Sequence, residues 1–223
     1  MSEIEDELAP AEVVSSTIAF EGLIWNVKRD EVALSDESVT REYLAHPGAV
    51  GIIALDDDDR VLLVRQYRHP VRSMLWEAPA GLLDVEGEHP LRTAQRELLE
   101  EAHYTAGTWH VLYDTYLSPG GSTESMRCFL ARDLAPATGE RFIGHGEERD
   151  MEQRWLPLDE LVARALGGKI HSPVTLTGAL AAHIARESGW ATLRAPDSPW
   201  PERFPVGLPP LPPEAVSEPA PPR

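Results

Sequence analysis

The stretch Arg96–Tyr104, RELLEEAHY, decides the fold, and it places three glutamates in a segment with helical hydrophobic spacing. Residues four apart share one face of an α-helix, so Glu97 and Glu101 are neighbours whose like charges repel. A divalent cation would remove this repulsion, because hard ions such as Mg²⁺ and Mn²⁺ prefer oxygen ligands. For this segment alone, the alternative is a solvated acidic face balanced by Arg92 and Arg96 along the helix.

Most of the remaining chain alternates between strand-like and helical patterns. Four aspartates at 56–59 indicate a polar hairpin loop, because aspartate tolerates turn conformations and their spacing resembles no calcium loop. Strands and helices mix without strict βαβ alternation, which predicts an α+β or mixed-sheet architecture. The expected helices are 90–103, 158–168 and 172–189, and the expected strands are two within 13–34, then 40–46, 49–55, 60–69, 107–118, 124–134 and 151–158, with a loop over 75–90.

The composition limits the classes of partner. The 223 residues, 42% of them hydrophobic, suffice for one substantial domain. A net charge of −17 argues against nucleic acid or an anionic membrane surface as the main partner. The single cysteine, Cys128, excludes an intrachain disulfide and lies in an apolar run that indicates burial in a reducing compartment. With no membrane-length apolar run and an acidic N-terminus unlike a signal peptide, a cytoplasmic, soluble protein is expected.

The context of the glutamates carries a family resemblance. WEAPAG precedes them at 76–81, six residues separate Gly81 from Glu88, and seven residues separate Glu88 from Arg96. This pattern resembles the Nudix box of the Nudix hydrolases. It departs from that box twice, because the box has five residues in the first interval and a glycine where His103 stands. The second departure falls at the helix end, where glycine would supply a left-handed cap.

The resemblance implies an enzyme that hydrolyses a nucleoside diphosphate linked to another moiety. It implies that Glu97 and Glu101 bind metal, with Glu100 as a supporting ligand or catalytic group. The backbone carbonyl of Ala80 resembles a further ligand of this family. The structural residues of the box would be Gly81, Glu88 and Arg96, the last two joined by an ion pair. Metals between phosphate oxygens would neutralise charge and lower the pKa of bound water.

The chain over about 13–188 is similar to ADP-ribose pyrophosphatases within this family. The similarity rests on REYLAHPGAVGIIAL, VLLVRQYRHPV, LWEAPAGLLD and SPGGSTE, the last at 118–124. It implies Mg²⁺-dependent hydrolysis of ADP-ribose to AMP and ribose 5-phosphate, with Mn²⁺ as a second candidate. One alternative is another nucleoside diphosphate sugar, such as an ADP- or GDP-hexose. A third reading is a non-catalytic module that senses ADP-ribose.

Further site residues are candidates with competing structural roles. In this family the base that activates water usually lies in a loop beyond the box, where Glu147 and Glu148 stand. An arginine could bind pyrophosphate or pair with a surface carboxylate, and a tryptophan could stack on adenine or be buried. The candidate substrate-binding residues are Arg68, Arg72, Trp25, Trp76, Glu77 and Glu124.

The implied fold is α+β, an α/β/α sandwich with a mixed sheet and an N-terminal antiparallel strand extension. Residues 1–45 would form a strand segment that exchanges between subunits of a homodimer, and 46–190 would form the Nudix hydrolase domain. Proline is concentrated in 195–223, which predicts an extended or disordered tail. The number of metals and the choice between the two loop glutamates are left open by the sequence.

Overall fold

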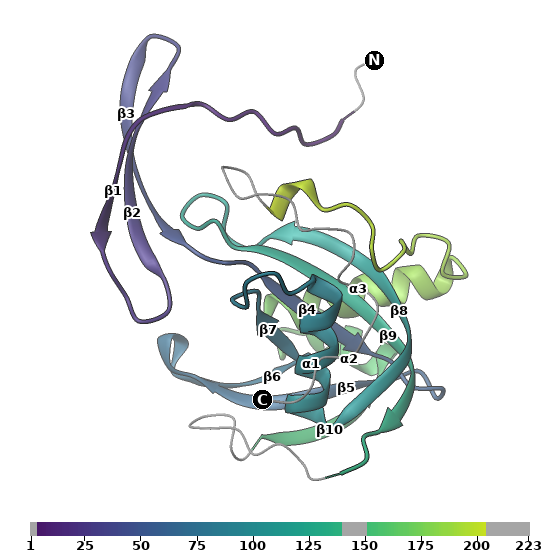
Figure 1. Ribbon diagram of the computed structural model, residues 1–223. Coiled ribbons are helices and arrows are strands. Elements are labelled where there is room, and N and C mark those ends of the chain that lie inside the picture. Colours follow the sequence, from purple (N-terminus) through teal and green to yellow (C-terminus); the bar gives the residue numbers. More distant parts are fainter. Residues whose placement is uncertain (1–3, 140–150, 204–223) are drawn as a thin grey trace.

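The computed structural model describes residues 4–139 and 151–203 (Figure 1). Three sheets and three α-helices make up this part of the chain. None of these helices is both long enough and apolar enough to span a membrane. The elements are β1 (Glu12–Phe20), β2 (Asn26–Leu34), β3 (Glu37–Ala45), β4 (Ala49–Ala54), β5 (Arg60–Arg68), η1 (His69–Val71), β6 (Ser73–Glu77), β7 (Ala80–Leu82), α1 (Pro90–Ala102), β8 (Tyr104–Tyr116), β9 (Ser125–Pro136), β10 (Glu152–Pro157), α2 (Leu158–Leu166), α3 (Pro173–Glu187) and η3 (Pro201–Arg203).

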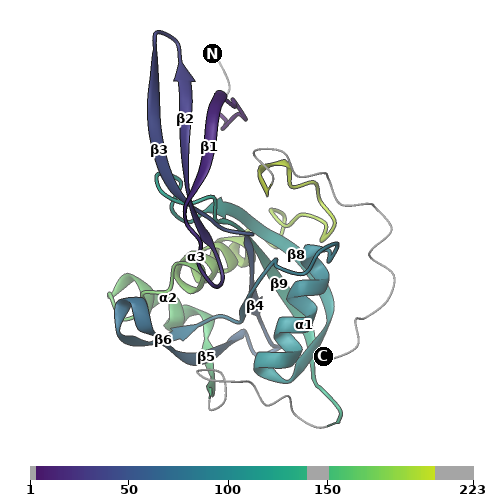
Figure 2. The ribbon, with the colours of Figure 1, turned by 60° about the vertical axis from the view of Figure 1, so that its left-hand side comes forward.

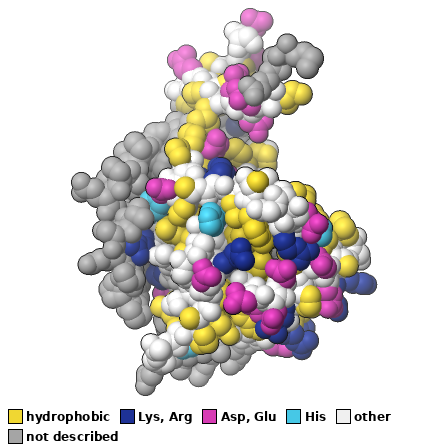
Figure 3. Space-filling view, turned by 90° about the vertical axis from the view of Figure 1, so that its right-hand side faces the viewer, with side chains coloured by type: hydrophobic (Ala, Val, Ile, Leu, Met, Phe, Trp, Pro, Cys, Tyr) yellow, Lys and Arg dark blue, Asp and Glu magenta, His cyan; other side chains and the backbone are white. Residues whose placement is uncertain are grey.

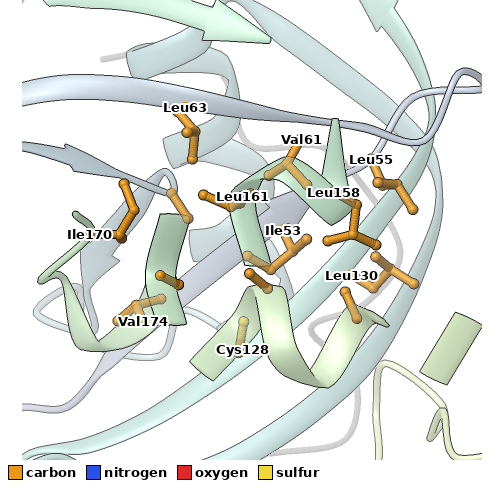
Figure 4. Close-up of a cluster of buried hydrophobic side chains, with 14 of the residues drawn as sticks. Ile53, Leu55, Val61, Leu63, Cys128, Leu130, Leu158, Leu161, Ile170 and Val174 are labelled. Carbon is orange, nitrogen blue, oxygen red and sulfur yellow. The ribbon is translucent and has the colours of Figure 1, made fainter. Parts of the chain in front are cut away.

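The body is an α/β/α sandwich, as the sequence predicted. Its central sheet has the order β7-β4-β9-β8, in which β4 and β9 run parallel and the other pairs antiparallel, so the sheet is mixed. A second sheet, β10-β5-β6, is antiparallel. Because side chains alternate along a strand, Ile52 packs with the cluster that contains α1, whereas Ile53 packs with α2 and α3 (Figure 4). Cys128 is fully buried in the cluster that contains Ile53, as expected.

The N-terminal strands form a separate antiparallel sheet, β1-β2-β3, that stands away from the body (Figure 2). We call this sheet the arm. Every residue of β1 is exposed, and large apolar side chains are among them. Ile18 and Phe20 are 56% and 64% exposed. Hydrophobic and acidic side chains share the surface of the arm above the body in Figure 3. A monomer therefore leaves an unusual amount of apolar surface in water.

Two expectations from the sequence need correction. The segment 75–90, expected to be a loop, contains the end of β6 and the whole of β7, separated by Ala78 and Pro79. The first part of the expected tail, 195–203, packs on the body instead. There the guanidinium of Arg127, 2% exposed as a side chain, donates to the carbonyl oxygens of Ser198 and Pro199 at 2.7 and 3.1 Å. The prediction for the rest of the tail, 204–223, lies outside the described residues.

The end of α1 keeps a left-handed cap although it has no glycine. His103 adopts φ 60° and ψ 39°, and its backbone N–H donates to the carbonyl oxygen of Leu99 at 3.0 Å. A residue with a side chain pays about 1 kcal/mol or more for this conformation, whereas glycine adopts it freely. The unusual residue therefore alters the energy of the cap and leaves its geometry intact.

Replacement of this histidine should stabilise the protein. His103→Gly is expected to raise the free energy of unfolding by up to about 1 kcal/mol, because relief of the strained φ exceeds the added chain entropy of the unfolded state. For a chain of this size that is a rise of about 2–4 °C in Tm, measured by calorimetry. His103→Ala is the matched control, since it keeps a Cβ in the strained conformation. Equal Tm values for the two variants would contradict the explanation.

Candidate active site

The turn before α1 absorbs the extra residue of the box. The N–H of Glu88 donates to the carbonyl oxygen of Val85 at 3.2 Å, and Gly87 has a φ of +78°. Glycine is suited to this turn because it adopts a positive φ without strain. Pro90 then begins the helix, and Nδ1 of His89 accepts the backbone N–H of Leu91 at 3.3 Å. The longer loop therefore still delivers the chain to a capped helix.

Arg96 binds three carboxylates that come from two segments. Its Nε and Nη2 donate to Oε1 and Oε2 of Glu88 at 3.2 and 3.0 Å, which is the expected ion pair. Its Nη1 donates to Glu97 at 2.7 Å and to Glu100 at 3.2 Å. Burial by itself lowers the pKa of Arg96, but the hydrogen bond to Glu88 and the charges of the glutamates outweigh it and raise the pKa. The guanidinium is therefore permanently charged.

The other end of the box lies against the same helix. A Cβ at Gly81 would collide with Cγ, Cδ and Oε1 of Glu97, so only glycine lets β7 approach α1 this closely. The backbone N–H of Ala80 donates to Oε2 of Glu101 at 3.1 Å. The helix carboxylates and the Ala80–Gly81 backbone are thus in direct contact. Residues at 80–81 and 97–101, separate in sequence, form one acidic surface.

The chemistry of these donors fits a hard divalent cation. Carboxylate and carbonyl oxygens are the ligands that such ions prefer, and a carboxylate oxygen can accept from arginine and also face a cation. Because position 81 is a glycine, the Glu97 carboxylate occupies the space that a side chain there would fill, directly beside the backbone of β7. Within 4–139 and 151–203, no three acidic, histidine or cysteine side chains already converge as a ligand cluster. Arg96 instead holds Glu97 and Glu100, and Ala80 holds Glu101.

A cavity of about 580 Å³ opens beside this acidic surface. This volume is in the range of small-molecule sites. One part of its wall is Ala80, Gly81 and Glu101, and another part is Ile24 and Trp25 from the segment between β1 and β2. The remaining lining residues are His46, Ala49, Gln66, Arg68, Glu77, Ala78, Leu82, Leu117, Glu124, Met126, Ser172, Pro173 and Val174. Residues of both the arm and the body therefore line the cavity.

Arg68 and Glu77 lie together in the cavity wall. The Nη2 of Arg68 contacts Oε2 of Glu77 at 2.6 Å, and its Nε is 3.1 Å from each carboxylate oxygen. The arginine side chain is 43% exposed, whereas the glutamate is 9% exposed. The pair orients the guanidinium toward the cavity and reduces its net charge. Both roles considered for Arg68, contact with ligand and pairing with a carboxylate, are compatible with this arrangement.

The other sequence candidates divide into those inside and outside the cavity. Trp25 and Glu124 line it. Trp76 is partly buried against the core and lies under the guanidinium groups of Arg65 and Arg154, and it is not among the lining residues. Arg72 follows η1 in a left-handed conformation, also outside the lining. The candidate bases Glu147 and Glu148 lie outside the described residues.

Several residues of the site were not predictable from the sequence. His46, Gln66 and Ser172 line the cavity but belong to no charged motif. Thr175 accepts the backbone N–H of Ala78 at 2.7 Å on its buried hydroxyl, and so supports the segment that carries Glu77 and Ala80. A signal was available only for the histidine, which ends a predicted strand and begins the sequence His-Pro-Gly. Such a turn holds its first residue at a strand end.

The chain belongs to the Nudix family, whose NUDIX domain model matches residues 45–177. It is thus a Nudix hydrolase, as the residues of the box indicated. An ADP-ribose pyrophosphatase of Mycobacterium tuberculosis is 44% identical over 197 residues, which are 86% of this chain and 92% of that protein. An ADP-ribose pyrophosphatase of Bacillus subtilis is 36% identical over 129 residues, 57% of this chain and 69% of that protein.

A solved structure gives the same fold. The crystal structure of an ADP compounds hydrolase superposes with a TM-score of 0.66 and 21% sequence identity, over 84% of this chain and 100% of that chain. At this identity the match shows the fold alone. The α+β Nudix architecture expected from the sequence is confirmed by this match and by the sandwich of the body.

The close approach at position 81 is open to a direct test. Gly81→Ala should lower kcat by about 100-fold, because a displacement of about 1 Å in a reacting group has effects of that size. The collision displaces the Glu97 carboxylate or β7. Gly167→Ala is the control, since Gly167 at the end of α2 has an ordinary φ of −79°. Circular dichroism should show both variants folded. Unchanged kcat in folded Gly81→Ala would show that this contact does not set the site geometry.

Proposed function

We propose that this protein hydrolyses the pyrophosphate bond of ADP-ribose and releases AMP and ribose 5-phosphate. Water adds across one P–O–P linkage, and its oxygen becomes a new phosphate oxygen. The observation that carries the proposal is the shared cavity. Its lining includes Trp25, an aromatic residue of the arm, together with Ala80 and Glu101 of the acidic surface. A nucleoside diphosphate sugar requires both features, a surface for the base and a cation-binding region for the pyrophosphate. The similarity to two ADP-ribose pyrophosphatases supports the same substrate.

Nudix ADP-ribose pyrophosphatases depend on divalent metal, and we propose Mg²⁺ here, with Mn²⁺ as a substitute. Glu97 and Glu101 would hold it, supported by Glu100 and the carbonyl oxygen of Ala80. A bound ion of this kind neutralises phosphate charge and lowers the pKa of its water. Arg96 holds the carboxylates in a fixed orientation, through contacts of 2.7 and 3.2 Å to Glu97 and Glu100. The site therefore needs no reorganisation of the helix backbone.

The substrate-positioning roles follow from the cavity wall. Trp25 would stack on adenine, and the Arg68 guanidinium would bind a phosphate oxygen while Glu77 holds its other edge. A guanidinium fork can serve both partners because it carries five donors. For the general base we propose Glu147 or Glu148. Activity at neutral pH in the cytoplasm is part of the same proposal.

The metal role of the helix carboxylates is tested by single isosteric changes. Glu97→Gln and Glu101→Gln should each lower kcat by about 100-fold or more, since each removes one anionic ligand without changing side-chain volume. Glu160→Gln on α2 is the control, because Glu160 is an exposed residue that pairs with Arg164 on the same helix. Turnover is measured with ADP-ribose over a Mg²⁺ series, and a chelator should abolish it. Near wild-type turnover in a folded Glu97→Gln or Glu101→Gln would refute the assignment.

A substrate panel decides between the three readings of the sequence. Phosphate release after coupled phosphatase treatment is measured with ADP-ribose, an ADP-hexose and a GDP-hexose, each with Mg²⁺ and Mn²⁺. The largest kcat/KM is expected for ADP-ribose. A larger value for a hexose would favour the alternative substrate class. A flat panel combined with tight binding of ADP-ribose would favour a sensor.

We also propose that residues 1–45 form the dimer contact of a homodimer and exchange strands with a second subunit, beside a hydrolase domain at 46–190. The support is the arm, whose β1 is exposed along its whole length and carries large apolar side chains. Such an edge strand is normally covered in soluble proteins. The cavity reaches Ile24 and Trp25 of the same arm, so assembly and substrate binding would share residues.

Disruption of the arm should dissociate the dimer. Phe20→Asp places a charge on a side chain that is 64% exposed in one chain and would be buried in a dimer. Light scattering after gel filtration should show a shift toward the monomer mass at micromolar concentration. Leu166→Asp is the control, because Leu166 is similarly exposed, at 72%, but lies on α2. A monomeric wild-type protein would refute the dimer.

A further inference from the structure

The end of β3 and the loop before β9 are fixed to each other beside the cavity. The hydroxyl of Thr123 accepts the backbone N–H of His46 at 2.8 Å and donates to the carbonyl oxygen of the same residue at 3.0 Å. Backbone bonds continue this contact: Leu44 N–H donates to Gly121 at 2.9 Å, and Thr123 N–H donates to Leu44 at 3.0 Å. His46 and the neighbouring Glu124, 78 positions away in sequence, therefore hold a constant relative position.

The imidazole of His46 has a defined tautomer. Its side chain is 4% exposed, and Nδ1 accepts the backbone N–H of Gly48 at 3.0 Å. Burial lowers the pKa of His46, against the opposing charge of Glu124, so the ring is neutral near pH 7. A neutral ring that accepts at Nδ1 carries its proton on Nε2. That N–H is a donor at the cavity wall, since His46 is one of the lining residues.

A matching acceptor faces this donor. The nearest carboxylate oxygen of Glu124 is 3.8 Å from Nε2, which is too long for a hydrogen bond. The main chain of Glu124 is held on both sides, because its N–H donates to the Ser122 hydroxyl at 3.1 Å and its carbonyl accepts from Leu117 at 3.2 Å. A single oxygen atom can lie within hydrogen-bond distance of both Nε2 and the carboxylate. At this separation no atom fits between the two groups, so the bridging oxygen lies to one side of the line that joins them.

We propose that His46 and Glu124 together bind one hydroxyl of the ribose that carries the base, and so determine specificity for a ribonucleotide. The hydroxyl oxygen accepts from Nε2–H of His46, and the hydroxyl proton is donated to the carboxylate of Glu124. A hydroxyl suits this pair because it is both donor and acceptor. The inference rests on the proposed function, because it assumes a nucleoside diphosphate in the cavity.

The position of Trp25 assigns the hydroxyl to this ribose and not to the terminal one. The ring centroids of Trp25 and His46 are 5.2 Å apart, with an angle of 34° between the planes. A base stacked on the tryptophan has its own ribose as the next group along the ligand. Both ring systems line the same cavity as Glu101 and Ala80, where the pyrophosphate is proposed to lie. The terminal ribose lies beyond that point.

The experiment compares substrates that lack one hydroxyl. Wild-type kcat/KM is measured with ADP-ribose, with its 2′-deoxy and 3′-deoxy adenosine analogues, and with an analogue that lacks a hydroxyl on the terminal ribose. One of the two adenosine analogues should be about 10- to 100-fold poorer, because a buried pair built for a hydroxyl is left unpaired without it. A loss confined to the terminal analogue, or equal values for all four substrates, would overturn the assignment.

Two variants of His46 distinguish the roles of its two ring nitrogens. His46→Asn keeps an acceptor for the Gly48 N–H but removes the Nε2 donor, so the discrimination should fall to within about 3-fold of none. His46→Gln keeps a donor near Nε2 and should retain most of the discrimination, with a lower Tm. Glu124→Gln, which leaves burial unchanged, should weaken it. His183→Asn on the surface of α3 is the control and should behave as wild type. Wild-type discrimination in folded His46→Asn refutes the inference.

The affinity for the product AMP tests the inference independently of catalysis. The affinities of AMP, 2′-deoxy-AMP and 3′-deoxy-AMP are measured by calorimetry on the wild-type protein and on His46→Asn. A preference for AMP that is lost in the variant supports the pair even if no nucleotide sugar is hydrolysed, and that second result would refute only the proposed function. Equal affinities for the three nucleotides, or no binding of AMP, refute the hydroxyl-binding pair.

Discussion

Arg96 is the residue on which the geometry of the site depends, because it binds carboxylates from the loop before α1 and from α1 itself. Its side chain is 14% exposed and makes contacts of 2.7–3.2 Å to Glu88, Glu97 and Glu100. Three carboxylates this close would repel one another strongly in a partly buried position without a central cation. A lysine could not replace it, since a single ammonium lacks the planar fork that spans three partners. Arg96 therefore joins the loop firmly to the helix.

Hydrogen bonds between distant segments hold the rest of the cavity in place. Hydrogen bonds that the hydroxyl groups of Thr123 and Thr175 accept join segments that are 77 and 97 positions apart. Each satisfies a backbone N–H that no strand partner reaches, as buried polar groups require. Arg127 acts similarly on the other side of β9, where it pairs with Asp114 at 2.7 Å and holds 198–199 to the body. These contacts stabilise the fold and position the site at the same time.

Much of the fold was predictable from local patterns. The helix expected over 90–103 is α1, Pro90–Ala102, and the aspartates at 56–59 do connect two strands. The errors have physical causes. β6 and β7 are short, and Pro79 between them reads as a loop, so tertiary pairing with β5 and β4 decides their conformation. The segment 195–203 is proline-rich, yet Arg127 and its stacking on Trp200 at 4.7 Å hold it in place.

The sequence by itself determined the family, the helix that carries the glutamates and the pairing of Glu88 with Arg96, because these depend on spacing within one short segment. The tertiary structure alone decided which distant residues share the cavity. It placed Trp25, His46 and Glu124 together, and it left Trp76 and Arg72 outside the lining. The reason is that local spacing follows from helix and turn geometry, whereas the meeting of separate segments depends on strand register and on hydrogen bonds between them.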